Sequence, residues 1–188
     1  MFMIREPNEQ DVARFTSSQR DLPFTYDGVG LTNSTPPPGY TVDHNRTQLG
    51  TGETVFRVGV EAVKNWKQFE LGWVTIVPRG VAIEVGAMVA VKAHAYGTWT
   101  LSASRVVYTI DDSRRFGFAY GTLPDHVESG EERFLVEWLE DDSVWFDILA
   151  FSRPRHLLVK ASFPLARRLQ KRFARDSLQQ MKRLTAGD

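Results

Sequence analysis

The sequence has no cysteine among its 188 residues, which excludes a disulfide framework and thiolate chemistry. No apolar run approaches the roughly 18 residues that a membrane-spanning helix needs. The N-terminal residues MFMIREPNEQ carry acid and proline where a secretory signal has an apolar stretch. We therefore expect a cytoplasmic protein without a transmembrane segment.

Motifs for metal and nucleotide chemistry are also lacking. Gly50 and Gly52 precede a predicted helix, but the third glycine of a phosphate loop is absent, and Glu53 adds negative charge where phosphate would bind. The histidines do not pair at metal-ligand spacing: His44, His94, His126 and His156. We predict neither a metal site nor a cofactor.

Acidic residues are scarce at the C-terminal end. Lys and Arg balance Asp and Glu at 23 each, but residues 151–188 hold ten basic residues against two acidic ones. Such a basic end can meet phosphate or anionic lipid, or can pair with the acidic remainder of its own domain. We favour a basic face that meets no outside partner, because charged helix faces are usually only solvated. A partner surface would use Arg167, Arg168, Lys171, Arg172 and Arg175.

The C-terminal residues predict a long amphipathic helix beginning near Pro164, which suits a first-turn position. Apolar side chains recur there at helical spacing, interrupted by Ser177: Ala166, Leu169, Phe173, Met181 and Leu184. At 1.5 Å per residue the helix would be about 30 Å long. A helix with one narrow apolar face needs a sheet or another helix to lie on.

Two alternating runs separated by an acidic turn, residues 140–143, predict an antiparallel hairpin before this helix. A two-residue loop would bury Asp147 among apolar side chains, so we favour an odd-length loop. That register gathers one dry face: Phe134, Val136, Trp138, Val144, Phe146, Ile148 and Ala150.

The other hairpin face should carry Arg133, Glu137 and Asp147. Two close carboxylates can act as acid and base, but a cross-strand ion-pair ladder is the interpretation that we prefer. Apolar side chains beside them indicate a covered face, under the N-terminal segment or a second subunit of a homodimer: Leu135, Trp145, Leu149 and Phe151.

The remaining pattern predicts an α+β protein. A polar edge strand over residues 40–49 precedes a helix ending near residue 67, and four strands follow at 73–77, 81–95, 99–110 and 115–122. With the hairpin, this is the order of a helix-grip fold, a curved antiparallel sheet of about six or seven strands around a long C-terminal helix. We predict one domain over residues 1–188. In it, an N-terminal helix (8–20) and a Pro-rich connector ending at residue 39 pack on a helix-grip core, residues 40–188.

The strand at residues 115–122 has one aromatic face and one nearly bare face, formed by Gly117, Ala119 and Gly121. The bare face is expected to accept a closely packed helix. Room for a ligand is the alternative.

Several long segments resemble one family: residues 64–66, 71–74, 105–108, 115–124, 130–134, 151–155 and 168–177. The chain resembles uncharacterised protein family 0548, also called domain of unknown function nineteen-ninety. The resemblance implies a distant relation to the START and birch-pollen-allergen superfamily, and it carries over no activity. That superfamily has two short helices after its first strand, so the helix at residues 8–20 is expected to stand in for the second.

We therefore expect the protein to bind an apolar or amphipathic small molecule between sheet and C-terminal helix. Arg105, or Arg153 with Arg155, would hold an anionic head group. The predicted ligand contacts are Arg105, Tyr108, Tyr120, Trp138, Phe146, Arg153, Arg155 and Phe173.

Two alternatives stay open. One is a hydrolase or cyclase acting on a hydrophobic substrate, with Glu137, Asp147 and His126 as the catalytic candidates. The other is an adaptor whose basic helix binds an anionic membrane or nucleic acid, with steep salt dependence.

Overall fold

The computed structural model describes residues 1–154 and 163–187, so Arg155 lies outside the described residues. Its centre is one antiparallel sheet in the order β2-β8-β7-β6-β5-β4-β3. The strands are β2 (Thr41–Thr51), β8 (Ser143–Pro154), β7 (Glu128–Trp138), β6 (Arg115–Thr122), β5 (Thr98–Asp111), β4 (Met88–Ala95) and β3 (Val74–Val77). The predicted edge strand and the six strands after the helix are confirmed, although the strand predicted over residues 81–95 begins only at Met88. A short β1 (Phe2–Met3), which the sequence did not indicate, pairs with β5.

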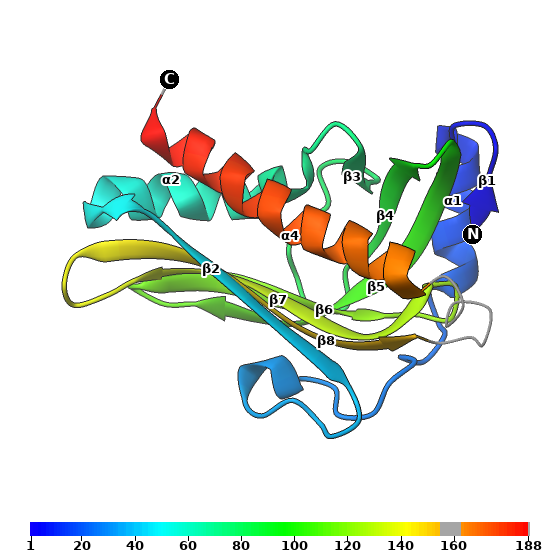
Figure 1. Ribbon diagram of the computed structural model, residues 1–188, viewed down its shortest axis with the longest axis horizontal. Coiled ribbons are helices and arrows are strands. Elements are labelled where there is room, and N and C mark those ends of the chain that lie inside the picture. The colour runs from blue at the N-terminus through cyan, green and yellow to red at the C-terminus, as the bar shows by residue number, and fades with distance from the viewer. Residues whose placement is uncertain (155–162, 188) are drawn as a thin grey trace.

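Two helices lie along the same face of this sheet (Figure 1). The long α4 (Phe163–Ala186) crosses the sheet, and α2 (Gly52–Lys64) packs beside it. A short η2 (Lys67–Phe69) follows α2 and also contacts α4. This arrangement confirms the α+β helix-grip prediction.

The N-terminal helix α1 (Glu9–Gln19) lies elsewhere. Its Val12 and Phe15 pack against Ala90, Leu101 and Ala103, on the face of β4 and β5 that points away from α4. It therefore does not stand in for the second short helix after the first strand, and that expectation was wrong. The short η2 follows α2 instead.

The register of the β7–β8 hairpin agrees with the odd-length loop. Phe134 pairs with Ile148, and five residues separate Trp138 from its partner Val144. The predicted dry face is therefore the concave face toward α2 and α4, where Phe134 and Phe146 are fully buried.

Aromatic rings fill the core between this concave face and the helices. The ring of Phe69, from η2, lies 5.2 Å from Phe134 on β7 and 5.0 Å from Phe173 on α4, centroid to centroid. Phe118 on β6 adds a further ring 5.3 Å from Phe134. Such pairs contribute roughly 0.5–1.5 kcal/mol beyond the area they bury, so this cluster holds four elements together: η2, β6, β7 and α4.

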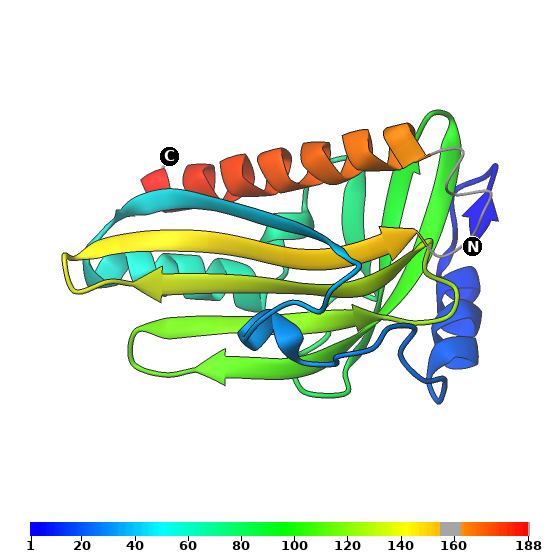
Figure 2. The ribbon, with the colours of Figure 1, turned by 60° about the horizontal axis from the view of Figure 1, so that its bottom comes forward.

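The connector after α1, with its short η1 (Leu31–Asn33), crosses the opposite face of the sheet (Figure 2). It is fixed by Glu131, a carboxylate that is 2% exposed. Glu131 accepts hydrogen bonds from the Tyr26 hydroxyl at 2.7 Å, the Gly30 N–H at 2.7 Å and the Thr32 N–H at 2.9 Å. Gly30 has φ +89°, a conformation that glycine adopts at little cost.

The bare face of β6 serves this connector. A Cβ added at Gly121 would lie 2.1 Å from the Tyr26 hydroxyl, so the missing side chain is what admits Tyr26. The expectation that a helix packs on this face was wrong, because the helices lie on the aromatic face of the same strand. The connector also buries Phe151, whose ring lies 5.6 Å from that of Tyr26.

We predict that Glu131→Gln destabilises the protein. The amide carries no charge and turns one acceptor into a donor that faces other donors, which should lower the free energy of unfolding by about 2–3 kcal/mol. Urea unfolding followed by circular dichroism measures this. Glu140→Gln, at an exposed site in the turn, is the matched control. A loss below about 0.5 kcal/mol would contradict the assigned role of Glu131.

Candidate functional site

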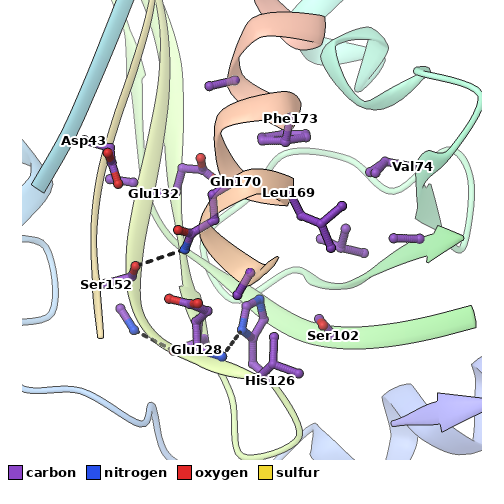
Figure 3. A pocket seen from close by; sticks show the side chains of 18 of the residues that line it. Asp43, Val74, Ser102, His126, Glu128, Glu132, Ser152, Leu169, Gln170 and Phe173 are labelled. Atoms are coloured by element: carbon purple, nitrogen blue, oxygen red, sulfur yellow. Dashed lines mark hydrogen bonds between the residues drawn. The ribbon is translucent and has the colours of Figure 1, made fainter. Parts of the chain in front are cut away.

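A cavity of about 430 Å³ lies between α4 and the concave face of the sheet (Figure 3). Its size falls in the range of roughly 300–1,000 Å³ that is typical of small-molecule sites. Several residues that line the cavity have a small side chain or none, which leaves space inside it: Ala93, Gly130, Ala150, Ala166 and Ala174.

One part of the cavity wall is apolar. Phe69 and Trp73 contribute aromatic surface, Val74 comes from the edge strand β3, and Leu169 and Phe173 come from successive turns of α4. The amphipathic stripe that predicted the helix thus supplies part of the lining.

Polar side chains line the rest, and the antiparallel register brings them together. Asp43 on β2 pairs with Ala150, Ala150 with Glu132 on β7, and Glu132 with Tyr120 on β6. Neighbouring strands lie about 4.7–4.9 Å apart, so these residues form one row across four strands. The Tyr120 hydroxyl donates to the Glu132 carboxylate at 2.8 Å.

Glu132 is half-buried and lines the cavity. Burial raises the pKa of Glu132 from 4.5 to about 7, and the negative charges of Asp43 and Glu128 add to the rise. The hydrogen bond from Tyr120 opposes it by favouring the ionised form. Burial, and next the charge of Glu132, raises the pKa of Tyr120 well above its ordinary value.

Asp43 is held differently, because Arg167 from α4 grips it with two nitrogens, one of them 2.7 Å from the carboxylate. This hydrogen bonding lowers the pKa of Asp43. Arg167 also donates to Gln170 at 2.8 Å, and Gln170 donates to the Ser152 hydroxyl at 3.3 Å. The charge of Asp43 is therefore matched within the protein.

Glu128 forms no ion pair with another described residue, although Arg167 interacts electrostatically with it at longer range. Glu128 is 7% exposed, lines the cavity, and its Oε1 has no hydrogen-bond partner in the part of the chain that the structure describes. Its backbone N–H donates to Nδ1 of His126 at 3.0 Å, so that ring nitrogen is an acceptor. A buried carboxylate oxygen without a partner is costly, which makes this the least satisfied part of the cavity wall.

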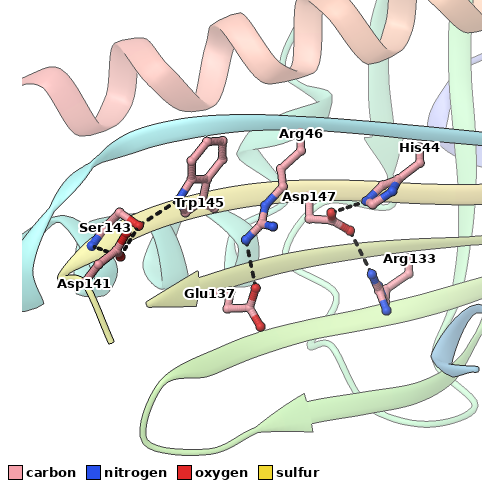
Figure 4. A network of polar contacts seen from close by, with 8 residues as sticks. All are labelled: His44, Arg46, Arg133, Glu137, Asp141, Ser143, Trp145 and Asp147. Atoms are coloured by element: carbon pink, nitrogen blue, oxygen red, sulfur yellow. Dashed lines mark hydrogen bonds and ion pairs between the residues drawn. The ribbon is translucent and has the colours of Figure 1, made fainter. Parts of the chain in front are cut away.

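The carboxylates proposed from sequence as an acid–base pair lie on the other face (Figure 4). Asp147 pairs with Arg133 at 2.8 Å and contacts His44, and Glu137 pairs with Arg46 at 2.9 Å. This is a ladder of cross-strand ion pairs, as preferred from sequence, although β2 supplies two of its members.

The other sequence-predicted residues divide between the two faces. Tyr120, Phe173 and His126 line the cavity. Phe146 is enclosed in the core, and Trp138 stacks on Phe56 with its ring nitrogen donating to Asp142 at 2.8 Å.

Three more of them contact the N-terminal segment. Arg105 donates to the backbone carbonyls of Arg20 and Leu22 at 3.0 and 2.5 Å. The Tyr108 hydroxyl lies 2.8 Å from that of Thr32, and the Arg153 guanidinium lies 4.5 Å from the Tyr40 ring. None of the three lines the cavity, which differs from the expectation that Arg105 or Arg153 holds an anionic head group.

The cations of α4 are partly engaged within the protein. Besides Arg167, both Arg172 and Arg175 pair with Asp176, at 3.3 and 2.8 Å, and Arg172 lies 4.3 Å from the Trp73 ring. Arg168 and Lys171 are exposed, and Lys171 reaches the rim of the cavity.

Sequence reasoning missed Asp43, Glu128, Glu132 and Gln170. A signal for two of them was present, because Glu132 and Glu128 continue the even-numbered face of Phe134 in steps of two. Asp43 and Gln170 reach the site through tertiary contacts that no local pattern reveals.

A sheet wrapped around a C-terminal helix, with a cavity between them, defines a protein of the helix-grip class. The chain belongs to the family described as "Domain of unknown function (DUF1990)", whose model matches residues 25–180. A UPF0548 protein of Dictyostelium discoideum is 35% identical, over 96% of this chain and 94% of that protein. The family resemblance is thereby confirmed.

Solved structures share the fold at low identity. Ara h 8.0201 superposes with a TM-score of 0.51 at 9% identity, over 80% of this chain and 100% of that chain. The di-domain ARO/CYC protein BexL from the BE-7585A biosynthetic pathway gives a TM-score of 0.55 at 14% identity, over 84% of this chain and 53% of that chain. These likenesses establish the birch-pollen-allergen type of fold.

Within residues 1–154 and 163–187, no helix is both long and apolar enough to cross a membrane. The same residues contain no group of three or more His, Asp or Glu side chains placed to hold a metal ion.

We predict that Glu132→Gln changes how stability depends on pH. Because the folded-state pKa is about 7 against an ordinary 4.5, the folded protein binds more protons than the unfolded chain between those values. Ionisation of Glu132 therefore lowers stability as pH rises through that window, and the loss persists above it.

The free energy of unfolding of the variant, relative to wild type, should thus rise by on the order of 3 kcal/mol between about pH 4.5 and 8. Urea unfolding across this range measures the difference, with Glu137→Gln, on the same strand but the outer face, as control. A difference that is flat with pH would contradict the assigned pKa.

Proposed function

We propose that this protein binds an apolar or amphipathic small molecule in the cavity between α4 and the sheet. The observation that carries the proposal is the cavity itself, about 430 Å³ with aromatic and aliphatic walls on one side and a few polar groups on the other. Protein interiors are normally packed to crystal-like density, so a space of this size inside a domain indicates room for a ligand.

The construction of the wall supports this proposal. Small residues line the cavity on both layers, Ala93 and Ala150 on the sheet and Ala166 and Ala174 on α4. Larger aliphatic side chains at these positions would close the space and bury more apolar area. The aromatic surface of Phe69 and Phe173 offers contacts to an apolar ligand.

A second candidate function is proton transfer to a bound apolar substrate. The specific observation is Glu132, whose carboxyl group faces the cavity and has a pKa of about 7. It accepts a hydrogen bond from the Tyr120 hydroxyl. A carboxyl with such a pKa suits general acid or base work near neutral pH. Chromatography with mass spectrometry of the ligand before and after prolonged incubation separates binding from turnover, since turnover yields a different compound even where proton transfer leaves the mass unchanged.

Adaptor activity through the basic helix ranks below both. Arg167, Arg172 and Arg175 already form ion pairs with Asp43 and Asp176, so a phosphate surface would compete with partners inside the protein.

We predict that Ala93→Phe, which places a ring in the apolar side of the cavity, weakens binding of the uncharged fluorescent probe N-phenylnaphthylamine at least tenfold. Fluorescence titration measures the dissociation constant, and native mass spectrometry of the purified protein detects any co-purified ligand. Ala95→Phe is the matched control, because Ala95 lies on the same strand but outside the cavity lining. No probe binding by wild type, or equal binding by both variants, would contradict the proposed function.

A further inference from the structure

We propose that the ligand carries a positively charged, hydrogen-bond-donating nitrogen head group, held between the carboxylates of Glu128 and Glu132. This inference rests on the proposed function and names the chemical class of the ligand.

The first support is the unpartnered oxygen of Glu128. The residue is 7% exposed, it lines the cavity, and Oε1 meets no hydrogen-bond donor among the described residues. Leaving such a group unpaired is costly, and a small rotation of the Glu128 side chain toward a donor on the ligand would remove that cost.

The second support is the geometry around Gly130. Gly130 lines the cavity, and Glu128 and Glu132 lie two residues to either side, each about 7 Å away along the strand. Gly130 has no side chain to separate the two carboxylates, and the backbone of Phe151 on β8 lies where its side chain would be. A small head group in the cavity between Glu128 and Glu132 lies within reach of both carboxylates, which can lean toward it.

The third support is the balance of charge. Among the described residues at the polar side, Asp43 is matched by Arg167, whereas Glu128 and Glu132 face the cavity without a paired cation. Lys171 reaches the rim, but it is exposed to solvent. A carboxylate or phosphate head group would therefore meet like charge, and a cation would meet opposite charge.

Aromatic walls agree with this class of ligand. Tyr120, Phe69 and Phe173 line the same cavity. An aromatic face attracts a nearby cation, and the remainder of the ligand can lie against the apolar wall.

The test compares three ligands that share one alkyl chain: decylamine, decanol and decanoate. Each ligand is titrated into wild-type protein that holds N-phenylnaphthylamine, and the loss of probe fluorescence measures its affinity. The titration is made at about pH 8, where Glu132 is ionised and the amine is charged. We expect decylamine to bind at least tenfold more tightly than decanol, and decanoate to bind most weakly. Decanol or decanoate binding as tightly as decylamine would overturn the inference while leaving the proposed function intact.

Matched variants locate the head group. Glu128→Gln and Glu132→Gln are each expected to weaken decylamine binding about tenfold relative to decanol binding by the same variant, and Glu137→Gln on the outer face should change neither. Equal decylamine affinity in all three variants would overturn the assignment. Failure of the probe itself to bind wild type would instead count against the proposed function.

A pH series on unmodified protein does not depend on any variant folding. The groups that face Glu132 are Tyr120 on β6, Asp43 on β2, Glu128 on β7, and Lys171 and Arg167 on α4, with His126 at the cavity edge.

Of these, Glu132 has a pKa of about 7, so its ionised fraction rises steeply from about pH 5.5 to 8. Decylamine affinity should rise about tenfold over this range, since the ligand binds the ionised form. An affinity that is constant or falls as pH rises would contradict the inference.

Discussion

The register of the β7–β8 hairpin is the constraint on which the rest of the structure depends. Side chains alternate between the two faces of a strand, so a slip of one residue would exchange the faces. In the observed register Phe134, Val136 and Phe146 point toward the helices, and Asp147 points outward to Arg133 and His44. A slipped register would bury Asp147 without a partner and expose the aromatic core, at a cost of several kcal/mol.

The same alternation separates two kinds of carboxylate along β7. Glu131 and Glu137, at odd positions, are fully partnered on the outer face, by the connector and by Arg46. Glu128 and Glu132, at even positions, face the cavity with fewer partners. Because both kinds lie on one strand, the difference reflects the face and not the local sequence. On β7, the carboxylates that hold the fold together have several hydrogen-bond or ion-pair partners, and those that face the cavity have fewer.

Much of this fold could be predicted from local patterns. Apolar residues that alternate along the chain predict the β7–β8 hairpin and its register, and apolar residues at helical spacing predict α4. The order of the elements indicates the helix-grip class. The candidate site was harder, because it depends on contacts between distant residues. Arg167 and Asp43 are 124 residues apart, and Arg105 bonds to carbonyls more than 80 residues earlier. The sequence shows that such residues are charged but not which residues they contact. For this reason it suggests Arg105 as a ligand contact.

If the cavity binds a ligand as proposed, stability and function compete in this fold. Larger side chains would fill the cavity and bury more apolar area. Apolar residues in place of Glu128 and Glu132 would remove two carboxylates whose burial is costly. Titratable groups with strongly raised pKa values in a cavity are typical of functional sites. A ligand that pairs with these carboxylates would recover part of the lost free energy on binding, because anything that binds the folded state alone stabilises it. On this argument the least stable part of the wall is where recognition is concentrated.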